Sequence, residues 1–272
     1  MFVMIITKDT VKNALRNVKD AVTAADAVIS YGKVRRSGRH ELKRLLTEPQ
    51  YHVLLSRISA VLEPDSYMPE PEGYRVSSLY LDDLAESAYY EKLSGVHHRV
   101  KYRFRWYNYS PELIHLECKE KRGDRIFKRS AAVSRNCLES YIKGDYRLLD
   151  ACDAPVCREV SRLSRERGLS PRVVVCYTRQ AFQHPLSHTR ITFDTALTAD
   201  PRFDCLFSRG SEALFPVPLP MLMPAHMSPG CILEIKYNEY IPKYISELLT
   251  SHSEVLAMSK YVLCRDALNL IH

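Results

Sequence analysis

Charged and apolar residues alternate in several short stretches of the chain. The clearest is Lys-Tyr-Arg-Phe-Arg-Trp over residues 101–106. Successive side chains of a β-strand point to opposite faces, so this stretch predicts a strand with its cations on one face and its rings on the other. Looser forms of the same pattern occur at 117–119, 177–179, 190–194 and 234–236. A repeated basic face is typical of a surface that binds a polyanion.

Hydrophobic periodicity predicts the remaining elements. Helices are expected over 49–62, 84–93, 136–143, 155–167 and 259–271. Strands are expected over 74–81, 98–107, 112–119, 125–133, 172–183, 188–195 and 230–237. Five prolines between 216 and 229 predict an irregular loop. Near the N-terminus, apolar residues recur at helical spacing from Val11 to Val22 and predict a short amphipathic helix.

The order of these elements predicts the fold class. Many strands, mostly in adjacent pairs and separated by few helices, favour an antiparallel α+β domain. Closure of the sheet into a barrel of about eight strands would enclose the charged faces and leave the aromatic faces against flanking helices. We expect a helical N-terminal extension over 1–38, followed by a single domain over 39–272.

Composition narrows the class of protein. The chain has 272 residues, of which 46% are hydrophobic and 26% charged, as in soluble globular proteins. Its apolar runs are too short to span a bilayer, and its start lacks a signal-peptide core, so a cytoplasmic location is expected. Eight cysteines form no CxxC pair, which favours structural thiols over a zinc site. The net charge of +7 permits an anionic ligand.

Convergence of the charged faces would produce one basic cavity. Cations that face one another across strands repel, so such a cluster destabilises the fold until an anion neutralises it. Arginine binds phosphate oxygens through two hydrogen bonds, and lysine adds a movable point charge. The candidate cations are Lys43, Arg103, Arg105, Lys119, Arg179, Arg190, Lys236 and Lys260. Glu117, Asp194 and Glu234 have the same strand parity and could hold Mg²⁺ or Mn²⁺ through oxygen ligands.

Two other interpretations stay open on the pattern alone. Any single alternation also suits the solvent face of an ordinary antiparallel sheet. A basic strand with aromatic residues also suits a nucleic-acid platform, on which bases stack against rings. In a regular strand, however, the rings at 102, 104 and 106 point away from the arginines, so no nucleic-acid partner is expected.

An ordered set of motifs resembles a known family. The set is Arg39-His-Glu-Leu-Lys43, Ser77-Ser-Leu-Tyr-Leu-Asp82, Lys101-Tyr-Arg-Phe-Arg-Trp-Tyr107, Leu116-Glu-Cys-Lys119, Phe127-Lys-Arg129, Val175-Cys-Tyr-Thr-Arg179, Arg190-Ile-Thr-Phe-Asp194, Leu233-Glu-Ile-Lys-Tyr237 and Ser259-Lys-Tyr261. It resembles the bacterial form of the polyphosphate polymerase domain of the vacuolar transporter chaperone (VTC) complex, within the CYTH-like superfamily of triphosphate tunnel metalloenzymes. The resemblance covers about 39–268.

This resemblance implies a tunnel-shaped antiparallel barrel that transfers the γ-phosphate of ATP to polyphosphate or pyrophosphate with Mn²⁺ or Mg²⁺. By position it implies catalytic roles for Arg103, Arg105, Lys119, Arg179 and Arg190. It implies phosphate binding by Lys43, Lys92, Lys101, Tyr177, Lys236, Ser259 and Lys260. It implies metal binding by Glu234, with Glu117 and Asp194 as further candidates.

The resemblance has one departure. The wider superfamily begins with alternating glutamates before the lysine, whereas this chain has Arg39-x-Glu41-x-Lys43, which suits the polymerase branch better than the hydrolase branch. Two rival functions stay open: a triphosphatase on the same fold, and a module that binds polyphosphate without turnover. The resemblance also implies that export of the product would require a separate membrane protein, which would associate this chain with a membrane.

Overall fold

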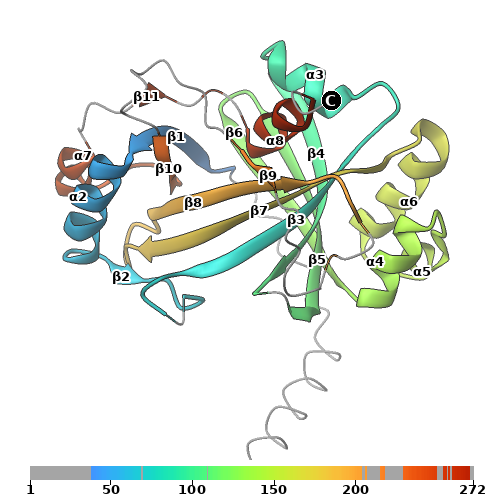
Figure 1. Ribbon diagram of the computed structural model, residues 1–272, viewed down its shortest axis with the longest axis horizontal. Helices are drawn as coiled ribbons and strands as arrows, with labels where there is room; N and C mark the ends of the chain where they lie inside the picture. The colour runs from blue at the N-terminus through green and yellow to red at the C-terminus, as the bar shows by residue number, and fades with distance from the viewer. Residues whose placement is uncertain are drawn as a thin grey trace, which may run out of the picture. The chain divides into compact units, whose positions relative to one another are not determined.

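An antiparallel sheet dominates the structure (Figure 1), a computed structural model that describes residues 38–68, 70–108, 110–203, 206, 215–217, 229–249, 254–255, 257 and 259–269. The helix predicted between Val11 and Val22 lies outside these residues, as does most of the proline-rich segment. The N-terminal extension therefore stays a prediction.

Nine strands form the main path of the sheet, in the order β11-β1-β10-β8-β7-β3-β4-β5-β6. They are β1 (His40–Thr47), β3 (Tyr74–Asp82), β4 (His98–Tyr107), β5 (Ser110–Arg122), β6 (Arg125–Val133), β7 (Ser170–Gln183), β8 (Arg190–Asp200), β10 (Pro229–Tyr237) and β11 (Glu254–Val255). The short strands β2 (Glu63–Pro64) and β9 (Phe215–Pro216) pair with β7 and β8. All these pairings are antiparallel, which confirms the α+β class with a large antiparallel sheet.

The two ends of this path approach each other near the start of β1. The Arg39 amide donates to the Ile126 carbonyl at 3.1 Å, and the Ile126 amide donates to the Arg39 carbonyl at 3.0 Å. This isolated bridge joins the residue before β1 to β6. In the part of the chain that the structure describes, no continuous ladder closes the sheet there.

Seven described helices accompany the sheet: α2 (Glu48–Ser59), α3 (Ser87–Leu93), α4 (Arg135–Ile142), α5 (Arg147–Asp150), α6 (Pro155–Arg167), α7 (Lys243–Leu248) and α8 (Lys260–Asn269). Local sequence explains their ends. Thr47 and Gln50 form a capping box at the start of α2, because each side chain binds the backbone amide of the other residue. Gly168, with φ of 66°, ends α6 in the left-handed conformation that glycine adopts without strain.

Most predicted elements are confirmed, with two differences that have local causes. The helix predicted over 84–93 begins only at Ser87, because Glu86 has a left-handed backbone with φ of 54°. Periodicity predicted no element over 40–47, where only the resemblance implied a strand. That segment is rich in Glu, Leu, Lys and Arg, which favour helices, and its pairing with β10 overrides this preference.

The aromatic face of β4 lies in the hydrophobic core, as the alternation predicted. Phe104 and Trp106 are fully buried and share one cluster with Leu138 of α4 and Val160 of α6. The described cysteines are all free thiols, and six of the seven are buried. Because helices cover the apolar face of β4, its charged residues are directed to the other face.

A buried carboxylate joins three elements near the end of β3. Asp82 accepts hydrogen bonds from the amides of Asp83, Ala88 and Tyr89 at 3.0, 2.9 and 3.1 Å. It also accepts one from the Tyr261 hydroxyl at 2.7 Å. The Tyr261 ring stacks on Tyr80 with 5.2 Å between ring centroids. Asp82 thus fixes the start of α3 and the position of α8 against β3.

We predict that Tyr261→Phe lowers the free energy of unfolding by about 2 kcal/mol, because it removes a buried hydrogen bond to a charged group. Guanidinium denaturation followed by the fluorescence of Trp106, the single tryptophan, measures this change. Tyr240→Phe is the matched control, because Tyr240 is 64% exposed and should leave stability unchanged. Equal stability of the two variants would contradict the role assigned to Tyr261.

Candidate functional site

A small polar cavity of about 80 Å³ lies against the charged faces of the central strands. We call it the basic chamber. It is lined by Lys43, Tyr80, Lys101, Arg103, Arg105, Lys119, Tyr177, Arg179, Glu234, Lys236, Ser259, Lys260 and Tyr261. Eight of these described residues are cationic, one is acidic and none is aliphatic.

A wider cavity of about 350 Å³ adjoins the chamber and shares Lys43, Lys101, Lys119 and Ser259 with it. We call it the basic mouth. Its other lining residues are Glu41, Leu42, Lys92, Arg99, Lys121, Asp124, Ile126, Val255 and Ala257. The two cavities therefore share part of their basic wall.

Strand register brings the chamber residues together. Tyr80 of β3 lies opposite Arg103 of β4, and Arg103 lies opposite Glu117 of β5. Lys43 of β1 lies opposite Glu234 of β10. Residues that are directly opposite in an antiparallel pair have side chains on the same face. The alternating charges therefore converge, as the sequence pattern predicted.

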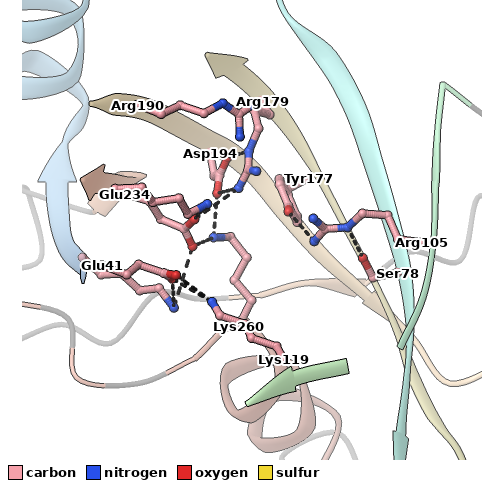
Figure 2. A network of polar contacts seen from close by, with 12 residues as sticks. Glu41, Ser78, Arg105, Lys119, Tyr177, Arg179, Arg190, Asp194, Glu234 and Lys260 are labelled. Carbon is pink, nitrogen blue, oxygen red and sulfur yellow. Dashed lines mark hydrogen bonds and ion pairs between the residues drawn. The ribbon is translucent and has the colours of Figure 1, made fainter. Parts of the chain in front are cut away.

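Arg103 and Arg105 have different partners. Arg103 Nε and Nη2 donate to Glu117 Oε2 at 2.8 and 2.6 Å, and Nη1 donates to the Tyr80 hydroxyl at 2.8 Å. Arg105 Nε donates to Ser78 Oγ and its Nη2 to the Tyr177 hydroxyl, both at 3.1 Å (Figure 2). Arg105 thus keeps its full charge beside neutral hydroxyl groups.

Two carboxylates hold the cations on the opposite side of the chamber (Figure 2). Arg179 donates to both oxygens of Asp194 at 2.6 and 2.7 Å. Lys260 Nζ lies 2.6 Å from Asp194 and 3.1 Å from Glu234. Glu234 Oε2 also lies 3.4 Å from Arg179 Nη2 and 2.9 Å from Lys236 Nζ. Asp194 and Glu234 together therefore neutralise part of the positive charge of these cations.

Glu41 supplies a further carboxylate at the boundary between chamber and mouth. It lies 2.7 Å from Lys119 Nζ and 3.3 Å from Lys43 Nζ. Lys43 Nζ is also 3.7 Å from Glu234, so this lysine bridges the two glutamates. The pair Lys119–Glu41 crosses from β5 to β1, next to the isolated backbone bridge.

These contacts divide the ionisable groups into two classes. Burial raises the pKa of Glu234, but Lys236, Lys260 and Lys43 outweigh burial and hold this pKa well below its usual range. Burial lowers the pKa of Lys92 to about 8, with further repulsion from Arg99 and Lys43. Burial, followed by repulsion from Lys43 and Lys92, places the pKa of Lys101 well below its usual value. The acids therefore stay ionised, whereas burial lowers the pKa of several lysines, among them Lys236, whose pKa is about 8 although it pairs with Glu234.

The structure brings together most of the residues implied by the resemblance. The chamber contains Lys43, Lys101, Arg103, Arg105, Lys119, Tyr177, Arg179, Glu234, Lys236, Ser259 and Lys260. Lys92 lines only the mouth. Arg190 lies outside the set that lines either cavity and pairs with Asp65 at 2.7 Å. The roles of all these residues stay predictions.

Several lining residues were not among the predicted site residues. Glu41 lies two residues before Lys43, so its side chain is on the same face of the strand, and this spacing could have identified it. Arg99 and Lys121 share the strand parity of Lys101 and Lys119, so the same signal was available for them. Tyr80 and Tyr261 lacked it, because their places depend on the register of β3 against β4 and on the approach of α8.

The carboxylates differ in their suitability for a divalent metal. Among the described residues, no group of three or more His, Cys, Asp or Glu could hold a metal ion. Mg²⁺ is commonly held by one or two carboxylates together with substrate phosphates, and Glu41 and Glu234 fit this requirement around Lys43. All four carboxylates pair with cations, but Glu41 and Glu234 pair mainly with lysine amines. Asp194 and Glu117 are held by the guanidinium groups of Arg179 and Arg103, each through two hydrogen bonds, so they fit less well.

No helix in the described ranges is long and apolar enough to cross a membrane.

Comparison with known proteins gives two kinds of result. No curated protein matches the sequence. Similar solved structures include PH1819 from Pyrococcus horikoshii OT3, with 12% identity, a TM-score of 0.43, and coverage of 83% of this chain and 97% of that chain. Another is a Vibrio parahaemolyticus protein named "putative adenylate cyclase", with 11% identity, a TM-score of 0.44, and coverage of 84% and 97%.

The family model described as the VTC domain matches residues 38–269. This match covers most of the chain and confirms the resemblance carried by the ordered motifs. The chain belongs to the VTC domain family.

Proposed function

We propose that this protein synthesises inorganic polyphosphate by transferring the γ-phosphate of ATP to a phosphate, pyrophosphate or polyphosphate acceptor. The observation that carries the proposal is the chamber wall, with eight cations, one carboxylate and no aliphatic residue among its described members. Such a wall suits a densely charged linear anion better than a neutral substrate. Membership of the VTC domain family supports the same chemistry.

The proposal includes a tunnel through the sheet. The Arg39–Ile126 bridge and the Lys119–Glu41 ion pair both connect the two ends of the strand path. These links support a barrel that closes around the phosphate chain, with the chamber and the mouth as successive parts of one bore. The aromatic faces of the strands would then lie outside, as Phe104 and Trp106 do.

Catalysis by this chamber would depend on positioning and charge neutralisation. Phosphoryl transfer from ATP passes through a loose transition state in which charge spreads over the transferred group. Arg105 donates to the hydroxyls of Ser78 and Tyr177, so it can direct its guanidinium to this group without breaking either of these contacts, neither of which is to a carboxylate. The acceptor oxygen is already anionic, so no strong protein base is needed.

The remaining predicted residues receive supporting roles. We assign Arg103, Arg179 and Lys119 to neutralisation of the triphosphate, and Arg190 to a contact that requires release from Asp65. Lys43, Lys92, Lys101, Lys236 and Lys260, with Tyr177 and Ser259, would guide the phosphate chain. Glu234, with Glu41, would hold Mn²⁺ or Mg²⁺, which supplies charge neutralisation at the phosphates when bound.

The mouth favours a chain product over a small one. The basic surface continues beyond the chamber through Lys92, Arg99 and Lys121. The cations of the chamber alone would neutralise a single triphosphate. A triphosphatase would not need this continuation. Transfer of a product across a membrane would require a separate membrane protein.

Incubation of the purified protein with ATP and Mn²⁺ tests the function directly. We predict long polymers on a denaturing gel, with one ADP formed for each phosphate incorporated. Release of free phosphate without polymer would replace the proposal with a triphosphatase. Binding of added polyphosphate without consumption of ATP would replace it with a binding module.

Substitution of Arg105 tests the assignment of the chamber. Arg105→Lys keeps the positive charge but loses the planar guanidinium, which can bind a phosphate through two hydrogen bonds. We therefore predict a decrease in kcat/KM on the order of 10²-fold. Arg129→Lys is the matched control, because Arg129 pairs with Glu159 and lines neither cavity. The control should keep wild-type activity. Full activity of folded Arg105→Lys protein would show that the reaction occurs elsewhere.

The pKa of Lys92, about 8, predicts a pH dependence of polyphosphate affinity. Below this pH Lys92 is charged in the free protein; above it the amine is neutral, and binding must take up a proton. Affinity should therefore decrease as pH rises above 8. In Lys92→Arg protein the guanidinium stays charged, so the decrease should be shallower. Titration calorimetry from pH 7 to pH 10 compares the two proteins, and identical slopes would contradict the assignment.

A further inference from the structure

Lys101 differs from the other lysines of the chamber. Lys43, Lys119, Lys236 and Lys260 each form an ion pair with Glu41 or Glu234. The Nζ of Lys101 instead donates to Ser259 Oγ at 2.8 Å and lies 5.2 Å from the centre of the Tyr261 ring. Among the described residues, no carboxylate forms a salt bridge with Lys101. Within the part of the chain that the structure describes, its hydrogen-bond partner is a neutral hydroxyl.

The charged groups that act most strongly on Lys101 all have the same sign. Lys43 comes from β1, Lys92 from α3, Arg99 from β4 and Lys119 from β5. Burial and these four cations together lower the pKa of Lys101 well below its usual value. A lysine with an ordinary pKa near 10.4 is neutral in only about four molecules in ten thousand at pH 7. Lys101 is therefore the chamber lysine best suited to present a neutral, nucleophilic amine.

Lys101 is also accessible to a small anion. It lines both the chamber and the adjoining mouth of about 350 Å³. The cations of the mouth would attract a phosphate group toward it and hold that group near the amine. Lys260, by contrast, has its amine between Asp194 and Glu234. A phosphate-bearing acylating agent thus meets an amine beside a neutral hydroxyl at Lys101 and an amine between two carboxylates at Lys260.

We propose that Lys101 is a site of covalent acylation by acyl phosphates. The inference rests on the proposed function in one respect, that the basic cavities bind phosphate anions. The Nζ lone pair attacks the carbonyl carbon of the acyl phosphate and forms an amide bond. The carbon–oxygen bond to phosphate breaks, inorganic phosphate leaves with that electron pair, and the proton released from nitrogen passes to the phosphate.

Acylation at this position would also inhibit the proposed reaction. The amide removes a chain-binding amine, and the acyl group occupies space between the chamber and the mouth. Acyl phosphate would therefore act as an inhibitor whose effect persists after the free reagent is removed.

Acetyl phosphate is the probe for the experiment. The full chain is incubated with it at pH 7.5, and acetylation of each lysine is followed by peptide mass spectrometry. We expect Lys101 to react on the order of tenfold faster than Lys243, whose side chain is 91% exposed, and Lys260 to react slowest. Tripolyphosphate should protect Lys101 and leave Lys243 unaffected. Lys101→Arg protein should lose this fast reaction and the persistent inhibition.

Two measurements keep the inference separate from the proposed function. An uncharged acetylating ester should give a smaller preference for Lys101 over Lys243 than acetyl phosphate does, because it lacks the phosphate group. Equal preferences, or reaction of Lys101 no faster than that of Lys243, would overturn the inference. Calorimetric binding of tripolyphosphate together with an unreactive Lys101 would overturn the inference alone, whereas failure of tripolyphosphate to bind would overturn the proposed function.

Discussion

Repulsion among cations that share one face of the sheet is the constraint on which the site depends. Asp194 and Glu234 relieve it on one side through Arg179, Lys236 and Lys260, and Glu117 relieves it on the other through Arg103. Buried ion pairs add little net stability, because desolvation of both charges opposes their attraction. The internal carboxylates are therefore better understood as groups that position the cations than as sources of fold stability.

Carboxylate partners are unevenly distributed among the cations of the two cavities. In the chamber most cations have an acidic partner, so their geometry is set before a ligand arrives. In the mouth, burial and neighbouring cations lower the pKa values of Lys92 and Lys101. Preorganised charges suit the transition state of phosphoryl transfer. Charges without partners suit reversible binding of a moving chain, since each phosphate that leaves is replaced by the next.

The two faces of each strand depend on each other. Phe104 and Trp106 pack against α4 and α6, which fixes the face of β4 that is buried. The opposite face of β4 therefore directs Arg103 and Arg105 into the chamber. Asp82 performs a related task on β3, because it binds the start of α3 and the Tyr261 hydroxyl of α8. Tyr261 in turn stacks on Tyr80, whose hydroxyl accepts from Arg103. Polar and apolar packing outside the chamber thus position the charges inside it.

The sequence by itself determined the strands with alternating faces, the antiparallel α+β class and the set of inward cations, because a strand has a side-chain period of two that a single chain displays directly. The ordered motifs also determined the family. Tertiary structure decided which cations receive carboxylates. Lys260 and Lys101 are both lysines of the same chamber, yet one lies between Asp194 and Glu234 and the other beside Ser259. Arg190 has the correct parity but pairs with Asp65, far away in sequence. Electrostatic partners depend on distances of a few ångströms between strands, and those distances exist only once the register and the approach of α8 are established.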